Sequence, residues 1–271
     1  RSQIGDRPVI QLTLSAGGDR ISWDNPDSSV TVSVPYAPTD EELLDPEHIV
    51  VWYMDGSGNV VPVPNGRYDP ATGMVVFSVS HFSQYAVAYV HKTFADLGGV
   101  EWARKAIEVL ASKGVINGTS LSTFSPDNNI TRADFVTLLV RTFGLTADFG
   151  DNFDDVTPDA YYYEAVGIAK KLGIAKGHGD MFTPGDSITR QDMMTLTARA
   201  LIVFKGLREN AGLSILDRFG DKVGIAEYAA PSIAALVAEG LVEGSGGMLN
   251  PVSTATRAEA AVFLYRIYSG F

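Results

Sequence analysis

Hydrophobic and polar residues alternate along the first ninety residues of the chain, which is the pattern of strands that bury one face. Short runs rich in β-branched and aromatic residues carry this alternation, and they predict strands at 9–14, 29–34, 49–54, 74–79 and 84–90. Turn-forming clusters at 55–59 and 69–73 favour tight antiparallel connections. Residues 1–91 are therefore predicted to form a small antiparallel β-sandwich. The acidic segment 39–47 is expected to be an exposed loop or a single helical turn.

At residues 91–93 the hydrophobic period changes from two to about 3.6, which is typical of amphipathic helices. The positions that share one helical face are Ala103, Ala106, Ile107, Leu110 and Ala111, and later Tyr161, Ala165, Ile168, Ala169 and Leu172. Gly114 and Gly173 stand where these helices are expected to end. The change of period predicts a domain boundary and an α+β multidomain chain whose second part is all-α.

Three further helix starts are marked by one recurring stretch of four residues. It reads Thr131-Arg132-Ala133-Asp134, then Thr189-Arg190-Gln191-Asp192, then Thr256-Arg257-Ala258-Glu259. A threonine three residues ahead of an acid is the spacing of a capping box, in which the hydroxyl accepts from the third helical N–H while the carboxylate reaches back. Arginine holds the first helical position each time, where the helix dipole disfavours a cation and favours an anion. The recurrence therefore suggests an anionic ligand at each helix start.

Other residues recur in the same register as the three arginines. They are the Asp of a Phe-x-Asp motif (Asp96, Asp155, Asp221), an aromatic residue eight positions after that Phe (Trp102, Tyr161, Tyr228), and a glycine (Gly118, Gly177, Gly244). Units of this length with two helices each cannot bury a core alone, so the copies are expected to pack together. We place the three repeats at 92–147, 148–212 and 213–271.

The composition narrows the choice of partners. The formal net charge is −11, which argues against nucleic acid or an anionic membrane surface as the partner. The chain has no cysteine, which excludes disulfides and thiolate chemistry and is compatible with a bacterial extracellular protein. No segment has the apolar length of a membrane span, so no membrane insertion is expected. The chain starts at Arg1 and soon enters strand-like sequence, which suggests a piece of a longer protein.

The repeated register resembles the S-layer homology family, over residues 92–271 and in all three copies. The resemblance rests on the recurring motifs above, together with Phe-x-Pro at 124–126 and 182–184 and Ile-Thr-Arg-Ala-Asp-Phe at 130–135. It implies a pseudo-threefold bundle of three repeats with grooves between neighbours. It also implies a secreted protein of the cell surface, held in the cell wall or S-layer without a covalent bond. The β region resembles, more loosely, modules that precede such anchors.

The resemblance further implies the ligand. Family members bind a secondary cell-wall polysaccharide, a peptidoglycan-linked glycan whose terminal N-acetylmannosamine carries a pyruvate ketal. The ketal is a carboxylate, which agrees with the anion indicated by the arginines, and an arginine fork can meet a carboxylate with two hydrogen bonds. The predicted ligand-binding residues are Arg132, Arg190, Arg257, Thr131, Thr189, Thr256, Asp96, Asp155, Asp221, Gly118, Gly177, Gly244, Trp102, Tyr161 and Tyr228.

Structural roles stay open for each of these residue types. The arginines can be surface cations paired with carboxylates, which contribute little to stability. The Asp residues can bind sugar hydroxyls, orient the arginines or cap the following helix. The aromatic residues can belong to the core or to a seam between helices, and the glycines can serve backbone geometry at a turn.

The third copy departs from the family pattern. It has Leu249 in place of the Phe of Phe-x-Pro, Ala255 in place of Ile, and Lys222 where Leu97 and Val156 stand. We therefore expect the sites of Arg132 and Arg190 to dominate binding.

Catalysis, cofactors and metals are not expected. His48, His81, His91 and His178 form no paired constellation in the sequence, and no nucleophile motif or phosphate loop is present. The acidic stretch Asp148, Asp151, Asp154 and Asp155 lacks the rhythm of a calcium loop and is interpreted as a solvated linker. The alternative function is a structural module for protein–protein assembly in a surface lattice.

Overall fold

The computed structural model describes residues 9–26 and 28–270, and the chain divides into two units, Arg1–Phe124 and Ser125–Phe271. The predictions for residues 1–8, 27 and 271 lie outside the described residues. Each unit is described below by itself.

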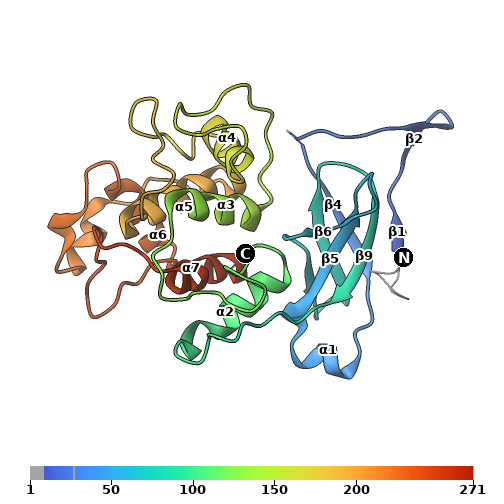
Figure 1. The fold of residues 1–271 in the computed structure, drawn as a ribbon, viewed down its shortest axis with the longest axis horizontal. Coiled ribbons are helices and arrows are strands. Elements are labelled where there is room, and N and C mark those ends of the chain that lie inside the picture. The colour runs from blue at the N-terminus through green and yellow to red at the C-terminus, as the bar shows by residue number, and fades with distance from the viewer. Residues whose placement is uncertain (1–8, 27, 271) are drawn as a thin grey trace. The chain divides into compact units, whose positions relative to one another are not determined.

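The first unit contains an antiparallel β region with two sheets (Figure 1). One sheet has the order β1 (Val9–Gln11), β9 (Gln84–Tyr89), β5 (Ile49–Met54) and β6 (Val60–Val63). The other has the order β4 (Val30–Pro35), β8 (Met74–Val79) and β7 (Arg67–Asp69). A separate hairpin joins β2 (Leu14–Ala16) to β3 (Asp19–Ile21).

Both sheets contribute to one hydrophobic core. Val51 and Val87 are paired across β5 and β9, and they share this core with Phe77 of β8. Every second residue of β8 is buried, as the alternation in the sequence predicts for a strand with one solvent-facing side. The predicted antiparallel β region is therefore present, with apolar residues of two sheets enclosed between them.

The predicted strand 9–14 is wrong in its extent. The structure ends β1 at Gln11 and begins β2 at Leu14, because the hairpin turn at Gly17 and Gly18 draws the later residues away. Both glycines have positive φ, +64° and +96°, a conformation that suits glycine. The short strands β6 and β7 were also not predicted.

The acidic segment 39–47 forms a short helix, α1 (Asp40–Leu44), followed by a 3-10 turn, η1 (Pro46–His48). Thr39 and Glu42 make a capping box that fixes its start. Of the two structures expected here, the helical turn is therefore the one that forms.

The first unit also includes the helix α2 (Glu101–Ser112), which packs against the β region. The buried ammonium of Lys113, directly after α2, donates to the backbone oxygens of Ile49 at 3.0 Å and Gly66 at 2.8 Å. Gly114 lies so close to Pro62 that an added Cβ would stand 2.6 Å from the proline ring. The first unit thus extends beyond residues 91–93, and the repeat boundaries stay a prediction.

The second unit is helical. Its elements are α3 (Arg132–Phe143), α4 (Tyr163–Lys171), α5 (Arg190–Lys205), η2 (Leu213–Arg218), η3 (Lys222–Gly224), α6 (Ala230–Ala238) and α7 (Arg257–Ser269). The three helix starts predicted from the recurring stretch are confirmed at α3, α5 and α7. Gly114 and Gly173 follow α2 and α4 with φ of +73° and +71°, which confirms them as helix ends.

A closed ring of backbone hydrogen bonds precedes these three helices. The N–H of Ile130 donates to the backbone oxygen of Ala255 at 3.0 Å. The N–H of Ala255 donates to the oxygen of Ile188 at 3.1 Å, and the N–H of Ile188 donates to the oxygen of Ile130 at 3.0 Å. All three residues are buried. The ring brings the starts of α3, α5 and α7 together, although they are far apart in the sequence.

Within the described part of the chain, every helix is too short or too polar to cross a membrane.

Candidate functional site

The helices α3, α5 and α7 begin at the threonine that the sequence marks as the cap. Its hydroxyl accepts from the N–H three residues later, at 3.1 Å for Thr131 and 3.2 Å for Thr189 and Thr256. Among these three helices only α7 has the full capping box, with Glu259 accepting from the N–H of Thr256 at 2.9 Å. The box predicted for all three copies is wrong for the two Asp copies, because the Asp side chain is one methylene shorter and bonds elsewhere.

The first two N–H groups of each helix also have partners. In α3 the N–H of Arg132 donates to the backbone oxygen of Asp186 at 2.9 Å, and the N–H of Ala133 donates to the backbone oxygen of Pro184 at 3.1 Å. The equivalent acceptors are Ser253 and Pro251 for α5, and Asn128 and Pro126 for α7. Because three N–H groups are occupied at every start, an anion there would have to rely on side chains.

Arg132 reaches from α3 into the loop before α5. Its Nε donates to the oxygen of Phe182 at 3.1 Å, and its guanidinium lies 5.2 Å from the centre of the Phe182 ring. One terminal nitrogen lies 3.3 Å from Oδ2 of Asp192. The side chain is 18% exposed, so it is held in place and remains in contact with solvent.

Arg190 repeats this arrangement one copy later. Its Nε donates to the oxygen of Leu249 at 3.0 Å, and a terminal nitrogen lies 3.4 Å from Glu259. Arg257 lies close enough to Tyr161 for its positive charge to act on that phenol, in the direction that lowers the pKa. All three predicted arginines are thus placed beside residues of another copy.

The carboxylate of Asp192 is shared among three donors. Oδ2 accepts from the Thr189 hydroxyl at 2.9 Å and faces Arg132 at 3.3 Å, while Oδ1 accepts from the Tyr228 hydroxyl at 2.7 Å. Burial, and then this bond to Asp192, raises the pKa of Tyr228 to about 12. Arg199 also lies close enough for its charge to act on Tyr228. We refer to Arg132, Asp192, Arg199 and Tyr228 as the Asp192 cluster.

A matching group surrounds Asp134. The Tyr161 hydroxyl donates to Asp134 at 2.5 Å, and burial, followed by this bond, raises the pKa of Tyr161. The charge of Arg257 acts on the same phenol, as does Arg141, whose own pKa is lowered by burial. We refer to Arg141, Asp134, Tyr161 and Arg257 as the Asp134 cluster. The second unit therefore builds the same kind of site twice from different copies.

The aromatic residues of the register are exposed at the surface. Trp102, Tyr161 and Tyr228 each have more than half of their surface in contact with solvent. A place in the core is therefore excluded for them. The tyrosine hydroxyls are fixed by carboxylates, which leaves the rings available to a ligand.

The Asp residues of Phe-x-Asp support a backbone loop. Asp155 accepts from the N–H of Phe182 at 2.8 Å and of Thr183 at 2.7 Å, and Asp221 holds residues 249 and 250 in the same way. Asp96 accepts from the N–H of Phe124 at 2.8 Å. The middle residue of each loop, Ser125, Thr183 or Asn250, has a positive φ between 52° and 57°, which is uncommon outside glycine.

This loop presents the carbonyl that receives the arginine. In the second copy, Asp155 holds the N–H of Phe182 while the oxygen of the same residue accepts from Arg132. Asp155 is thus a positioning residue for the arginine site in this structure. Its direct contact with a sugar stays a prediction.

The three glycines of the register are required by packing. A Cβ on Gly177 would lie 2.6 Å from the oxygen of Met181 and from the ring of Phe153, and Gly244 meets Met248 and Phe219 in the same way. A Cβ on Gly118 would lie 2.4 Å from the oxygen of Ser120. Backbone geometry and close packing therefore explain these glycines without a ligand, and ligand contact stays a prediction.

Sequence reasoning missed Arg141 and Arg199. Each stands nine positions after the arginine of the recurring stretch, as does Arg266 in α7. Burial lowers the pKa of both Arg141 and Arg199, and Arg199 donates to the oxygen of Ile174 at 3.3 Å. Their fixed spacing in the register was the signal that could have identified them.

The acidic stretch 148–155 does not act as one group. Asp151 pairs with Lys170 at 2.6 Å, whereas Asp155 binds the loop described above. This division favours the interpretation of the stretch as a linker.

The expectation that the histidines form no pair is wrong. The rings of His48 and His91 lie 4.5 Å apart, centre to centre, and His48 also contacts Asp45 at 3.2 Å. These residues come from separate parts of the first unit, which the sequence alone does not bring together.

The sequence profile of the S-layer homology domain matches this chain three times, at residues 93–136, 152–194 and 218–261. These matches confirm the resemblance to three tandem S-layer homology repeats. Domains of this family are non-catalytic and anchor surface proteins to the cell wall.

Several curated proteins are similar to the chain. An amylopullulanase of Thermoanaerobacterium thermosulfurigenes is 31% identical over 95% of this chain and 13% of its own length. The surface-layer 125 kDa protein of Lysinibacillus sphaericus is 30% identical over 61% of this chain and 14% of its length. The S-layer protein sap of Bacillus anthracis is 27% identical over 66% of this chain and 21% of its own length. The chain thus spans about a fifth or less of the length of these relatives. The family match and the two surface-layer relatives confirm the predicted location at the cell surface.

Proposed function

Because the chain belongs to the S-layer homology family, we propose that it anchors a surface protein by binding a pyruvylated secondary cell-wall polysaccharide. The pyruvate carboxylate of a terminal N-acetylmannosamine is the group that we assign to Arg132, Arg190 and Arg257. We further propose that the chain itself catalyses no reaction, and that its partner is the glycan linked to peptidoglycan.

The observation that carries this proposal is that the guanidinium of Arg132 makes only a long contact with the carboxylate of Asp192. A charge-assisted contact between a guanidinium and a carboxylate is usually about 2.7–2.9 Å long. Arg132 stands 3.3 Å from Asp192, whose oxygens also receive the Thr189 and Tyr228 hydroxyls. A guanidinium has five N–H donors, so a ligand carboxylate can add two well-aligned hydrogen bonds.

The held position of Arg132 favours the same function. Its Nε is fixed by the oxygen of Phe182, and the Phe182 ring lies under the guanidinium. An arginine that is already ordered loses less side-chain entropy when it binds than a free surface arginine would. This preorganisation supports a binding role over that of a solvated surface cation.

The exposed aromatic rings suit a sugar. Tyr228 in the Asp192 cluster and Tyr161 in the Asp134 cluster each place a half-exposed ring near an arginine. An amphipathic ring can cover the apolar face of a pyranose while its hydroxyl stays bonded to protein. We propose that carboxylate and sugar ring are bound together in one groove, by arginine and tyrosine.

We also propose that the three repeats form a pseudo-threefold bundle with one groove for each pair of neighbours. The closed ring of Ile130, Ile188 and Ala255 supports this arrangement, since each residue donates to one partner and accepts from the other. The equivalent contacts of Arg132 and Arg190 with the following copy support it as well.

Binding to purified cell-wall sacculi tests the proposal. Wild-type protein should sediment with sacculi after protease treatment of the wall and stay in solution once the polysaccharide is removed. Arg132→Ala should reduce the bound fraction, whereas Arg208→Ala, an exposed arginine outside both clusters, should not. Sedimentation that depends on wall proteins and not on polysaccharide would instead support the assembly module and overturn the anchor.

A further inference from the structure

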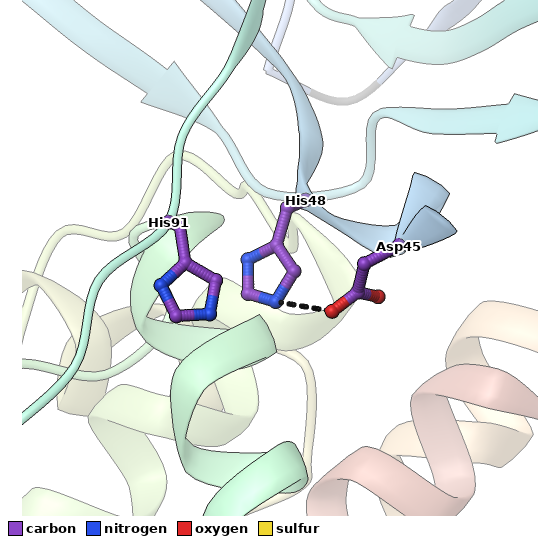
Figure 2. A group of neighbouring side chains, drawn as sticks. All are labelled: Asp45, His48 and His91. Atoms are coloured by element: carbon purple, nitrogen blue, oxygen red, sulfur yellow. Dashed lines mark ion pairs between the residues drawn. The ribbon is translucent and has the colours of Figure 1, made fainter. Parts of the chain in front are cut away.

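A side-chain cluster in the first unit lies away from both arginine clusters and has no part in the function proposed above. Asp45 precedes the turn η1, His48 ends that turn, and His91 follows β9. Figure 2 shows the three side chains turned toward one another. One possible ligand atom from each lies within 4.8 Å of the others.

The hydrogen bonds of His48 determine which ring nitrogen carries the proton. Its Nδ1 lies 2.9 Å from the Ser112 hydroxyl and 3.1 Å from the oxygen of Val90. The Ser112 hydroxyl gives its own proton to the oxygen of Glu108 at 2.8 Å, so it must accept from the imidazole. The oxygen of Val90 can only accept. Nδ1 is therefore the protonated nitrogen.

The other nitrogen of His48 then faces a second acceptor. In the neutral ring Nε2 carries a lone pair, and Oδ2 of Asp45 stands 3.2 Å from it. Two acceptors at this distance attract each other only if a cation lies between them, either a second proton on the ring or a metal ion. His48 is 1% exposed, so solvent water has little access to the lone pair on Nε2.

We propose that Asp45, His48 and His91 bind a divalent transition-metal ion of the zinc class. The ligands would be Nε2 of His48, one carboxylate oxygen of Asp45 and one ring nitrogen of His91. Two imidazoles with one carboxylate suit zinc and its neighbours, whereas calcium and magnesium prefer oxygen ligands alone.

The distances agree with a small tetrahedral ion. Bonds of about 2.0–2.2 Å place the ligand atoms of such an ion roughly 3.3 Å apart. Nε2 of His48 and Oδ2 of Asp45 already have about this separation, at 3.2 Å. His91 is about half exposed, so its ring is free to turn through the short remaining distance.

The surroundings resemble those of known metal histidines. A ligating imidazole usually donates its other N–H to a carbonyl or carboxylate, which fixes the ring, and His48 has this support from Val90 and Ser112. The carboxylate of Glu108 lies 3.8 Å from Nε2 of His91 and is itself held by the hydroxyl of Thr93 at 2.5 Å. Glu108 also accepts from the guanidinium of Arg104 at 3.3 Å, so it lies near the cluster as a carboxylate that is already paired with a cation.

The ion would fasten the β region to α2. Asp45 and His48 belong to the β region, His91 begins the connection to α2, and Ser112 and Glu108 lie on α2 itself. Metal binding should therefore stabilise the first unit and leave the arginine clusters unchanged.

Zinc titration of the whole chain, prepared without a histidine tag, tests this inference. Calorimetry should give one saturable site for Zn²⁺ in the wild-type protein, and Co²⁺ should develop the visible absorption of a nitrogen- and oxygen-ligated ion. His91→Ala and Asp45→Asn should each weaken binding at least about tenfold, since each removes one of three ligands. Both residues are partly exposed, so these variants are expected to fold, which circular dichroism checks.

His178→Ala is the matched control, because His178 is exposed and lies in a turn of the second unit. It should bind Zn²⁺ like the wild type, and a rise in melting temperature with Zn²⁺ should appear in both proteins and vanish in His91→Ala. The inference is overturned if no saturable site is found, if His91→Ala binds as tightly as the wild type, or if His178→Ala weakens binding as much.

Discussion

Lys113 in the first unit and Arg132 in the second are both cations held by backbone carbonyls, and their surroundings differ. Lys113 is 3% exposed and donates to two carbonyls, those of Ile49 and Gly66. Burial, with the nearby charge of Arg67, lowers its pKa to about 7. Arg132 is 18% exposed, uses one carbonyl, and faces a carboxylate that it shares with two hydroxyls.

The difference separates a structural cation from a binding one. The ammonium of Lys113 lies in a site that excludes solvent, so it can only serve the fold. Arg132 is anchored at Nε and still reaches solvent, which leaves its outer edge for a ligand. Substituting the two residues should therefore affect different properties of the protein.

The largest effect is expected for Lys113→Met. The substitution keeps the length of the side chain and removes the donor from two buried carbonyl oxygens, which should lower the free energy of unfolding by about 2–4 kcal/mol at about pH 10. At this pH the folded protein holds Lys113 as the neutral amine, so relief from burying a charge does not offset the loss. Denaturant unfolding measures this loss. Lys171→Met, at an exposed position in the last turn of α4, should change stability little and serves as the control. Equal losses in both variants would contradict a structural role specific to Lys113.

The pKa of Lys113 predicts a pH dependence of stability. Between about pH 7 and the ordinary lysine value near 10.5, the unfolded chain binds a proton that the folded protein has released. The free energy of unfolding should therefore rise with pH in this range, by about 2 kcal/mol from pH 7 to pH 9. Unfolding curves across this range should show the rise in the wild type and a smaller one in Lys113→Met. An equal slope in both proteins would exclude Lys113 as its source.

Thr131→Ala should have a smaller effect on the second unit. It removes the hydroxyl that caps α3 and should cost about 1 kcal/mol of stability. Thr131→Ser keeps the acceptor and should retain most of the stability in thermal unfolding. A serine variant as unstable as the alanine variant would show that the methyl group, and not the cap, is responsible.

The smallest expected effect is a difference in polysaccharide binding between the Arg132 and Arg190 sites. Arg132 lies over the Phe182 ring, whereas Arg190 meets Leu249 at the equivalent place. A cation–π contact at a partly exposed site is worth about 0.5–1 kcal/mol. Phe182→Leu should therefore weaken polysaccharide binding by a few-fold, measured by titration, and Leu249→Phe should leave binding unchanged or improve it slightly. A loss on Leu249→Phe that equals the loss on Phe182→Leu would contradict this account.

The repeated part of the fold was predictable because its three copies can be aligned with one another within the one sequence. Three copies of Thr-Arg-x-Asp/Glu marked the starts of α3, α5 and α7, and the glycines marked helix ends. The extent of the first strands was not predictable, because the β2–β3 hairpin and the short strands β6 and β7 have too few residues to show a period.

The residues of the arginine site were predictable from the sequence, whereas the roles of several of them were not. The sequence pointed to Arg132 and Asp155, but only the structure links them, through the N–H and the oxygen of Phe182. The pairing of His48 with His91 was missed for the same reason, since contacts between distant segments leave no periodic trace.

The claim that Arg132 binds the pyruvate carboxylate is tested most directly by calorimetric titration with a synthetic pyruvylated N-acetylmannosamine fragment and with its pyruvate-free counterpart. Wild-type protein should bind the pyruvylated fragment more tightly. Arg132→Ala should lose about ten- to a hundredfold for that fragment, the equivalent of about 1.5–3 kcal/mol for a charge-assisted hydrogen bond, and little for the pyruvate-free one. Arg208→Ala should bind both fragments as the wild type does. Equal affinity of the wild type for both fragments, or unchanged binding by Arg132→Ala, would contradict the account.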